Sequence, residues 1–295
     1  MTVKILAAFI LLSLSCTFIS AQEADRVIED GGTGKYTAIM TTDVSLPTHT
    51  LFRPKDLSAF GGKNKLPVIV WGNGACFNSP WEHVNFLSEI ASHGYLVIAI
   101  GKMPKESGDQ VRGSSKATLL LDAIDWITAQ NNAKKSIYYK KIATNMIAAS
   151  GMSCGGLQTL EVAGDKRLKT IIVCNSGIFI GTKSPHPAMP ALEKDQLKKI
   201  HTPTLYLLGG PSDIAYKNGM DDFSQINHVP VMVANLDVGH GGTYAKPHGG
   251  EFARVALEWY NWQLKGDVSA AKMFTGNPPD LAGSAGWTVQ KKNMH

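Results

Sequence analysis

Short, mostly apolar runs alternate along this chain with segments in which apolar residues recur every three or four positions. The apolar runs lie at residues 66–71, 94–100, 142–149, 170–174, 204–208 and 231–236. Runs of this length are typical of strands that are buried on both faces. A sheet made of such strands needs helices on both sides, and the intervening segments supply them. The pattern therefore predicts an α/β fold with a mostly parallel central sheet and helices on both faces.

Helical spacing is clear after Ser114 and Ser115, where apolar residues recur at intervals of three or four as far as Ile127. Either serine can cap that helix, because its side-chain oxygen can accept a hydrogen bond from a free backbone N–H. Further helices are expected at residues 81–92, 154–162, 192–199 and 251–264. A hairpin of antiparallel strands at residues 36–42 and 49–53 is expected before the first buried strand.

The first 21 residues have the three parts of a secretory signal peptide. Lys4 supplies the basic region, residues 5–14 form an apolar run too short to span a bilayer, and Ala21 is a small residue suited to the cleavage site. Cys16 raises the alternative of a lipoprotein anchor, but the residues before it match the lipid-attachment motif poorly. We therefore expect export, and a mature protein that is secreted or periplasmic.

The mature chain is expected to form one domain. Polar and Gly-rich residues at 22–35 predict a flexible leader, residues 36–265 the α/β domain, and residues 266–295 an extension packed on it. Composition agrees with this reading, because 44% hydrophobic and 18% charged residues exclude disordered and fibrous classes. The net charge of +5 comes from dispersed basic residues, so no nucleic-acid partner is expected. No stable membrane association is expected either, since no second apolar run of spanning length follows the leader.

A Gly-x-Ser-x-Gly motif follows the third buried run, as Gly151-Met152-Ser153-Cys154-Gly155. With a strand before it and a helix after it, this motif is typical of a nucleophile elbow, a sharp turn that holds the serine in a strained conformation. The alternative is an ordinary Gly/Ser loop. The context favours Ser153 as a catalytic nucleophile.

A serine nucleophile needs a base and a group that orients the base, and both follow in the expected order along the chain. Asp213 lies in the loop after the strand at 204–208, at the edge of the sheet where active sites of open α/β folds assemble. His240 lies directly after the last buried strand, in a Gly-rich loop. Asp237 competes with Asp213, but it is three residues from His240 on the same strand exit, which is an awkward position for contact. We predict a Ser153–His240–Asp213 triad.

The oxyanion formed during acyl transfer needs two preorganised N–H donors. The backbone N–H of Cys154 is one, because it follows the nucleophile at a helix N-terminus. Asn73, in the loop after the first buried strand, is the expected second donor, with Cys76 as the alternative if the loop is longer. Cys76 and Cys154 would then be neighbours in an exported protein, which suggests a disulfide between them.

At this point the chain resembles the α/β-hydrolase superfamily, most closely its secreted cutinase-like polyester hydrolases, dienelactone-hydrolase-like proteins and platelet-activating-factor acetylhydrolases. The resemblance is carried by Gly72-Asn73-Gly74-Ala75, Ala91-Ser92-His93-Gly94-Tyr95-Leu96-Val97, Gly151-Met152-Ser153-Cys154-Gly155-Gly156, Pro203-Thr204-Leu205 through Asp213, and Gly239-His240. It implies a serine ester hydrolase. Dienelactone hydrolases use Cys as the nucleophile, so Ser153 argues against that activity. Trp71 stands where many relatives have His, and the tail after residue 265 has no clear counterpart.

The expected function is hydrolysis of small or polymeric carboxylic esters through an acyl-enzyme. The short connection between residues 174 and 204 leaves little room for a lid, so an open cleft is expected, walled by Phe77, Trp81, Phe179 and Tyr244. Each of these aromatics could instead pack the core. Alternatives are a serine peptidase, an acyltransferase, or a non-catalytic binding protein of this fold. No cofactor or metal is expected, since the sequence has no phosphate loop and no metal-ligand cluster.

Overall fold

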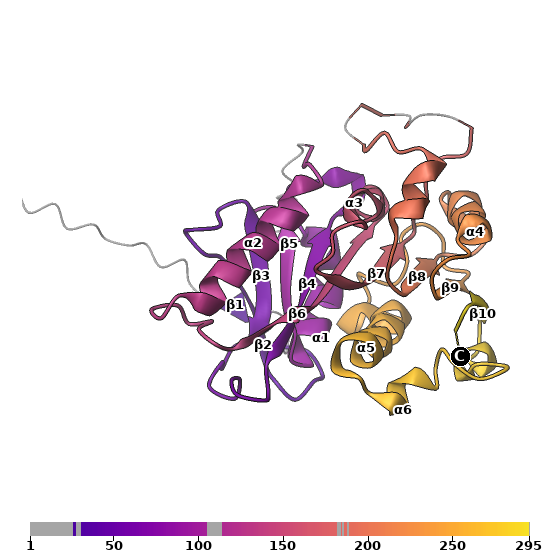
Figure 1. Ribbon diagram of the computed structural model, residues 1–295. Helices are drawn as coiled ribbons and strands as arrows, with labels where there is room; N and C mark the ends of the chain where they lie inside the picture. Colours follow the sequence, from indigo (N-terminus) through magenta and orange to yellow (C-terminus); the bar gives the residue numbers. More distant parts are fainter. Residues whose placement is uncertain are drawn as a thin grey trace, which may run out of the picture.

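The computed structural model describes residues 26–27, 31–104, 114–181, 184, 186–187 and 189–294. The predicted signal peptide lies outside these residues. In the described residues a ten-stranded sheet has the order β1-β2-β3-β5-β4-β6-β7-β8-β9-β10 (Figure 1). Its strands are β1 Arg26–Val27, β2 Ala38–Thr41, β3 His49–Pro54, β4 Leu66–Gly72, β5 Leu96–Ile100, β6 Ile142–Met152, β7 Leu168–Cys174, β8 Thr204–Leu208, β9 Val231–Leu236 and β10 Trp287–Lys292.

The centre of the sheet is parallel and its edges are antiparallel. Parallel pairing joins β5, β4, β6, β7, β8 and β9 in turn. The predicted hairpin of β2 and β3 pairs antiparallel with β5, and β10 adds an antiparallel strand beyond β9. The carboxyl ends of β4, β6, β7, β8 and β9 therefore meet at one edge, where the loops that carry the candidate residues emerge.

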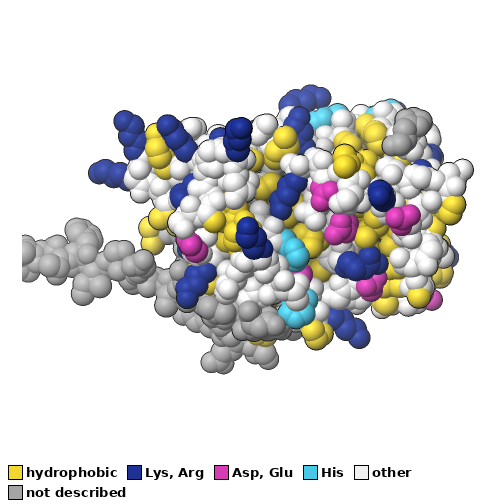
Figure 2. Space-filling view, turned by 90° about the horizontal axis from the view of Figure 1, so that it is seen from below, with side chains coloured by type: hydrophobic (Ala, Val, Ile, Leu, Met, Phe, Trp, Pro, Cys, Tyr) yellow, Lys and Arg dark blue, Asp and Glu magenta, His cyan; other side chains and the backbone are white. Residues whose placement is uncertain are grey.

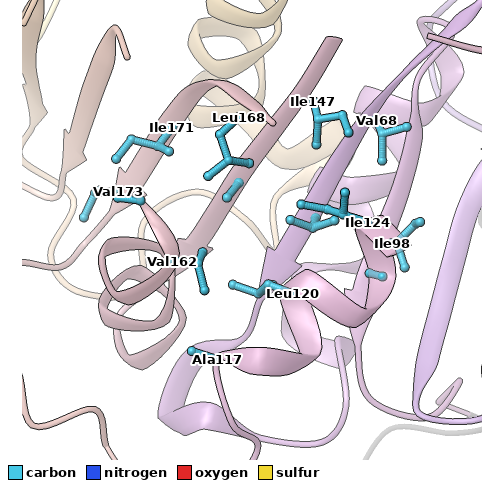
Figure 3. Packing of buried hydrophobic residues seen from close by; sticks show 14 of the residues in the cluster. Val68, Ile98, Ala117, Leu120, Ile124, Ile147, Val162, Leu168, Ile171 and Val173 are labelled. Carbon is cyan, nitrogen blue, oxygen red and sulfur yellow. The ribbon is translucent and has the colours of Figure 1, made fainter. Parts of the chain in front are cut away.

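Helices cover both faces, as predicted. The helices are α1 Val84–Ser92, α2 Thr118–Asn132, α3 Cys154–Val162, α4 Tyr216–Gln225, α5 Gly250–Lys265 and α6 Val268–Ala271. Short 3-10 helices are η1 Gly74–Cys76, η2 Trp81–His83, η3 Lys194–Lys199, η4 Pro247–Gly249 and η5 Asp280–Gly283. One apolar core lies between the sheet and α2, α3 and α4, and the other between the sheet and α1 and α5 (Figure 1). In the first core, Ile124 of α2 lies near Ile98 of β5, and Leu120 lies near Val162 of α3 (Figure 3).

Several segments differ from the sequence-based expectations, and α4, α6 and β10 were not expected at all. The residue that caps α2 is Ala117, with no side-chain capping bond, because Ser115 instead donates to the carbonyl of Cys76. Residues 194–199 form a 3-10 helix. Strand β6 continues to Met152, past the predicted end at residue 149, because its last residues pair with β7.

Residues 22–35 were predicted to form a flexible leader, and the described part of this segment contacts the domain. Arg26–Val27 pairs with β2, and the N–H of Thr33 donates to Glu89 Oε2 at 2.8 Å.

Charged side chains are spread over the surface seen from below in Figure 2, with Lys and Arg scattered among uncharged residues.

Candidate active site

Ser153 occupies the turn between β6 and α3 by itself. Its backbone has φ 53° and ψ −115°, a conformation that non-glycine residues rarely adopt and that costs about 1–3 kcal/mol. The turn is held in place because Ser176 Oγ donates to the Ser153 carbonyl at 2.7 Å and the Gly156 N–H donates to the same carbonyl at 2.9 Å. This strand, strained turn and helix form the nucleophile elbow that the motif predicts.

The two glycines of the motif are required by close backbone approach. A Cβ at Gly151 would lie 2.3 Å from the carbonyl oxygen of Gly155. A Cβ at Gly155 would lie 2.0 Å from the carbonyl oxygen of Gly72, at the end of β4. No side chain fits at either distance, so the elbow can sit against β4 only with glycine at both positions.

The side chains of Ser153, His240 and Asp213 form a continuous hydrogen-bonded series. His240 Nε2 lies 3.0 Å from Ser153 Oγ, and His240 Nδ1 lies 2.6 Å from Asp213 Oδ1. With Asp213 ionised, Nδ1 carries the proton and Nε2 is left to accept the hydrogen of the Ser153 hydroxyl. The imidazole is partly exposed, whereas the Asp213 carboxylate is fully buried.

Asp213 is kept ionised by donors from several segments. Burial by itself would raise the pKa of this carboxyl, but hydrogen bonds from His240, from the N–H groups of Ala215 and Gly209, and from Asn175 hold the pKa below its usual value. Asn175 Nδ2 donates to Oδ2 at 2.8 Å. The carboxylate therefore has the charge and the fixed position that orienting an imidazole requires.

Two loops pack together to bring the acid and the base into contact. The N–H groups of Val238 and Gly239, after β9, both donate to the carbonyl of Gly209, after β8, at 3.0 and 2.9 Å. Asp237, the competing acid, accepts a hydrogen bond from Ser212 Oγ at 2.7 Å on the exposed side of these loops. The geometry thus assigns contact with His240 to Asp213.

Asn175 is a site residue that the sequence reasoning missed. It directly follows β7, has φ 42°, and links Asp213 to Tyr244, whose hydroxyl donates to Asn175 Oδ1 at 2.5 Å. A polar residue at the carboxyl end of a buried strand was the signal available, because that sheet edge is where sites of this fold assemble.

The loop after β4 places Asn73 next to the elbow. The side chain of Asn73 is used within the loop, since Nδ2 donates to the carbonyls of Phe77 and Ile100 at 2.9 and 2.6 Å. Its backbone nitrogen lies only 2.8 Å from the position a Cβ would take on Gly155. The N–H of Cys76, the alternative donor, is directed to the carbonyl of Asn73 at 3.3 Å. The Cys76 N–H is thus used within the loop, and Asn73 stays the predicted second oxyanion donor beside Cys154.

A disulfide joins Cys76 to Cys154, with the two Cα atoms 5.1 Å apart. It connects the loop after β4 to the first residue of α3. Cys174 is the free cysteine among the described residues, and burial raises the pKa of its thiol to about 12. Such a thiol is unreactive at neutral pH.

The four aromatic residues expected in the cleft fall into two groups. Phe77, Trp81 and Phe179 are partly exposed, and Phe179 also packs against the core. For Tyr244 the expectation is wrong, because its side chain is buried among Trp71, His83, Phe86 and Phe252 and its hydroxyl is satisfied by Asn175. Tyr244 therefore supports the site from the core and does not line an open cleft.

A mostly parallel sheet that carries an elbow serine, followed by an acid and a histidine on later strand exits, defines the α/β-hydrolase fold. The model of the PET hydrolase-like family matches residues 60–219, which is more than half of the chain, and the chain belongs to this family. The match contains Ser153 and Asp213 and ends before His240. No curated protein matches the sequence. The family is one of ester hydrolases of this fold.

The described ranges contain neither a metal-binding cluster nor a membrane-spanning helix. Across that part of the chain, no group of His, Cys, Asp or Glu side chains is arranged to hold a metal ion. None of the helices described there is both long and apolar enough to cross a membrane.

Proposed function

We propose that this protein is an exported serine hydrolase that cleaves carboxylic esters through an acyl-enzyme intermediate. The observation that carries the proposal is the series from Asp213 through His240 to Ser153, ending on a serine whose backbone is held in a strained turn. Export is supported by the N-terminal sequence, with its basic residue, apolar run and small residue at position 21.

The chemistry assigns one role to each residue. Ser153 Oγ attacks the ester carbonyl carbon while His240 Nε2 takes the hydroxyl proton, and Asp213 stabilises the imidazolium that forms. The N–H groups of Asn73 and Cys154 donate to the oxyanion. Collapse of the tetrahedral species breaks the bond to the alcohol oxygen, which receives the proton from His240. A water molecule, deprotonated by His240, then attacks the acyl carbon and releases the acid and free Ser153.

The substrate class is a small or polymeric carboxylic ester, in line with the family. The partly exposed rings of Phe77 and Trp81, next to the loop that bears Asn73, offer apolar surface for an acyl or alcohol group. Triad chemistry alone would serve a peptidase or an acyltransferase equally well. Turnover should therefore be measured on a panel of substrates. The panel contains aryl, sugar and polyester esters, together with peptides and with alcohols that would compete with water as acyl acceptors.

A fluorophosphonate probe tests the proposal, because it reacts covalently only with an activated serine. We expect labelling of the wild type, no labelling of Ser153→Ala, and turnover of aryl esters that Ser153→Ala lacks. Asp213→Asn should lower kcat by about 10⁴-fold, since it favours the wrong imidazole tautomer. Asp237→Asn is the matched control and should retain activity. Wild-type protein that neither reacts nor turns over any ester would favour a binding protein instead.

A further inference from the structure

Cys76 is tied to α3 at two points. Its sulfur is bonded to Cys154, the first residue of the helix. Its carbonyl accepts hydrogen bonds from both the N–H and the hydroxyl of Ser115, each at 2.9 Å. Gln158, one turn further along α3, donates from Nε2 to Ser115 O at 2.8 Å and to Ser115 Oγ at 3.0 Å. The covalent and the hydrogen-bonded links thus run in parallel from the loop to the same helix.

The loop that contains Ala75 and Cys76 has a strained backbone, which must be held in place by contacts with the rest of the protein. Ala75 and Cys76 follow one another with φ 50° and 54°, in the left-handed region that costs a non-glycine residue roughly 1–2 kcal/mol. Ala75 is exposed. Two consecutive strained residues persist only where the surroundings over-determine them. Here the disulfide and the Ser115–Gln158 bridge act together with the hydrogen bonds of the Asn73 side chain to Phe77 and Ile100.

We propose that Cys76 is a positioning residue for the oxyanion donors. Together with Cys154, Ser115 and Gln158 it forms a clamp that makes the loop bearing Asn73 and the start of α3 move as one body. The two N–H groups then keep a fixed separation while the carbonyl oxygen becomes an oxyanion, which is the condition for strong electrostatic stabilisation. This inference rests on the proposed function of the same site.

Burial makes the clamp permanent. Cys76 and Gln158 are 0% exposed and Cys154 is 1% exposed, so a reductant cannot reach the sulfurs in the folded protein. Water cannot replace the Gln158 and Ser115 hydrogen bonds either, since Ser115 is also buried. The clamp is therefore removed by substitution, and the disulfide must form during folding in an oxidising compartment.

The test measures kcat and KM of the double variant Cys76→Ala/Cys154→Ala on a soluble aryl ester, together with the Ki of a trifluoromethyl ketone, which forms a tetrahedral adduct with the serine. We expect kcat to fall by about 10- to 100-fold, with KM changed less than about threefold, because ground-state binding does not use the oxyanion donors. The Ki should rise by the same factor as kcat/KM falls. Gln158→Leu keeps the disulfide. It should lower kcat by a smaller factor than the double variant does, again with little change in KM.

Leu51→Ala, in the core on β3, is the control for loss of stability alone and should leave kcat unchanged. If the double variant does not fold, the kcat of Gln158→Leu is the test of the clamp. A Gln158→Leu kcat equal to that of Leu51→Ala would overturn the proposal. The same result for a folded double variant would overturn it as well. Wild-type protein without turnover or labelling would instead refute the proposed function, so the two failures are distinguishable.

Discussion

Replacing Gly155 by Ala perturbs the contact on which the elbow depends. The added Cβ would lie 2.0 Å from the Gly72 oxygen, 2.2 Å from its carbonyl carbon and 2.8 Å from the Asn73 nitrogen, where ordinary contacts begin at 3.4 Å. All three atoms are backbone, and Gly72 ends a strand that is paired on both sides, so they cannot move independently. Overpacking usually costs 1–3 kcal/mol, and against rigid backbone we expect about 3 kcal/mol or more of lost unfolding free energy.

The same displacement would separate the Asn73 N–H from Ser153, and we expect kcat to fall by about 100-fold. Urea unfolding and aryl-ester kinetics measure the two effects. Gly164→Ala is the matched control, because a Cβ there meets only the Lys199 side chain and carbonyl, at 3.5 Å or more. It should change stability by less than about 1 kcal/mol. A Gly155→Ala protein with wild-type stability and kcat would refute the role given to this contact.

Two further variants probe the support of the site and a buried charge pair. Tyr244→Phe removes the donor to Asn175 Oδ1, and we expect a loss of about 1–2 kcal/mol in urea unfolding with a several-fold fall in kcat; unchanged values for both would contradict the link to Asp213. Lys194→Met removes the cation 2.6 Å from the fully buried carboxylate of Asp222, whose pKa burial raises to about 6. Because that pKa lies above the ordinary value, the protonated form favours folding, and the stability it provides is lost as pH rises through about 6. Without the cation, ionised Asp222 is unpaired, so we expect a loss of about 3–5 kcal/mol at pH 8 and a smaller loss at pH 5. Equal losses at the two pH values would contradict this assignment.

The strands were the most predictable part of the fold. Each buried apolar run became a strand within a few residues of its predicted bounds, because a run of that length has to be covered on both faces. The end of β6 was less predictable. Gly151 and Met152 look like turn residues in sequence, yet they pair with Val173 and Cys174 of the neighbouring strand. Such pairing depends on the partner strand and leaves no local mark.

In the candidate site, too, some residues could be predicted from the sequence and others could not. Ser153, Asp213 and His240 could be named because each follows a strand, and parallel strands deliver their ends to one edge. The support residues were missed or misassigned. Ser115 was expected to cap a helix, and Tyr244 was expected to face the cleft. Their actual partners, Cys76 and Asn175, are far from them in the chain.

The sequence by itself therefore determined the α/β class, the approximate positions of the central strands and the residues proposed to react, because periodicity and motif spacing are local properties. Only the tertiary structure decided how these groups are held. The packing of Gly155 on Gly72, the bridge from Gln158 through Ser115 to Cys76, and the buried contact between Tyr244 and Asn175 each join segments that meet only after the sheet has formed. The physical reason is that a close contact is a property of two backbones in space, whereas a sequence pattern describes one segment at a time.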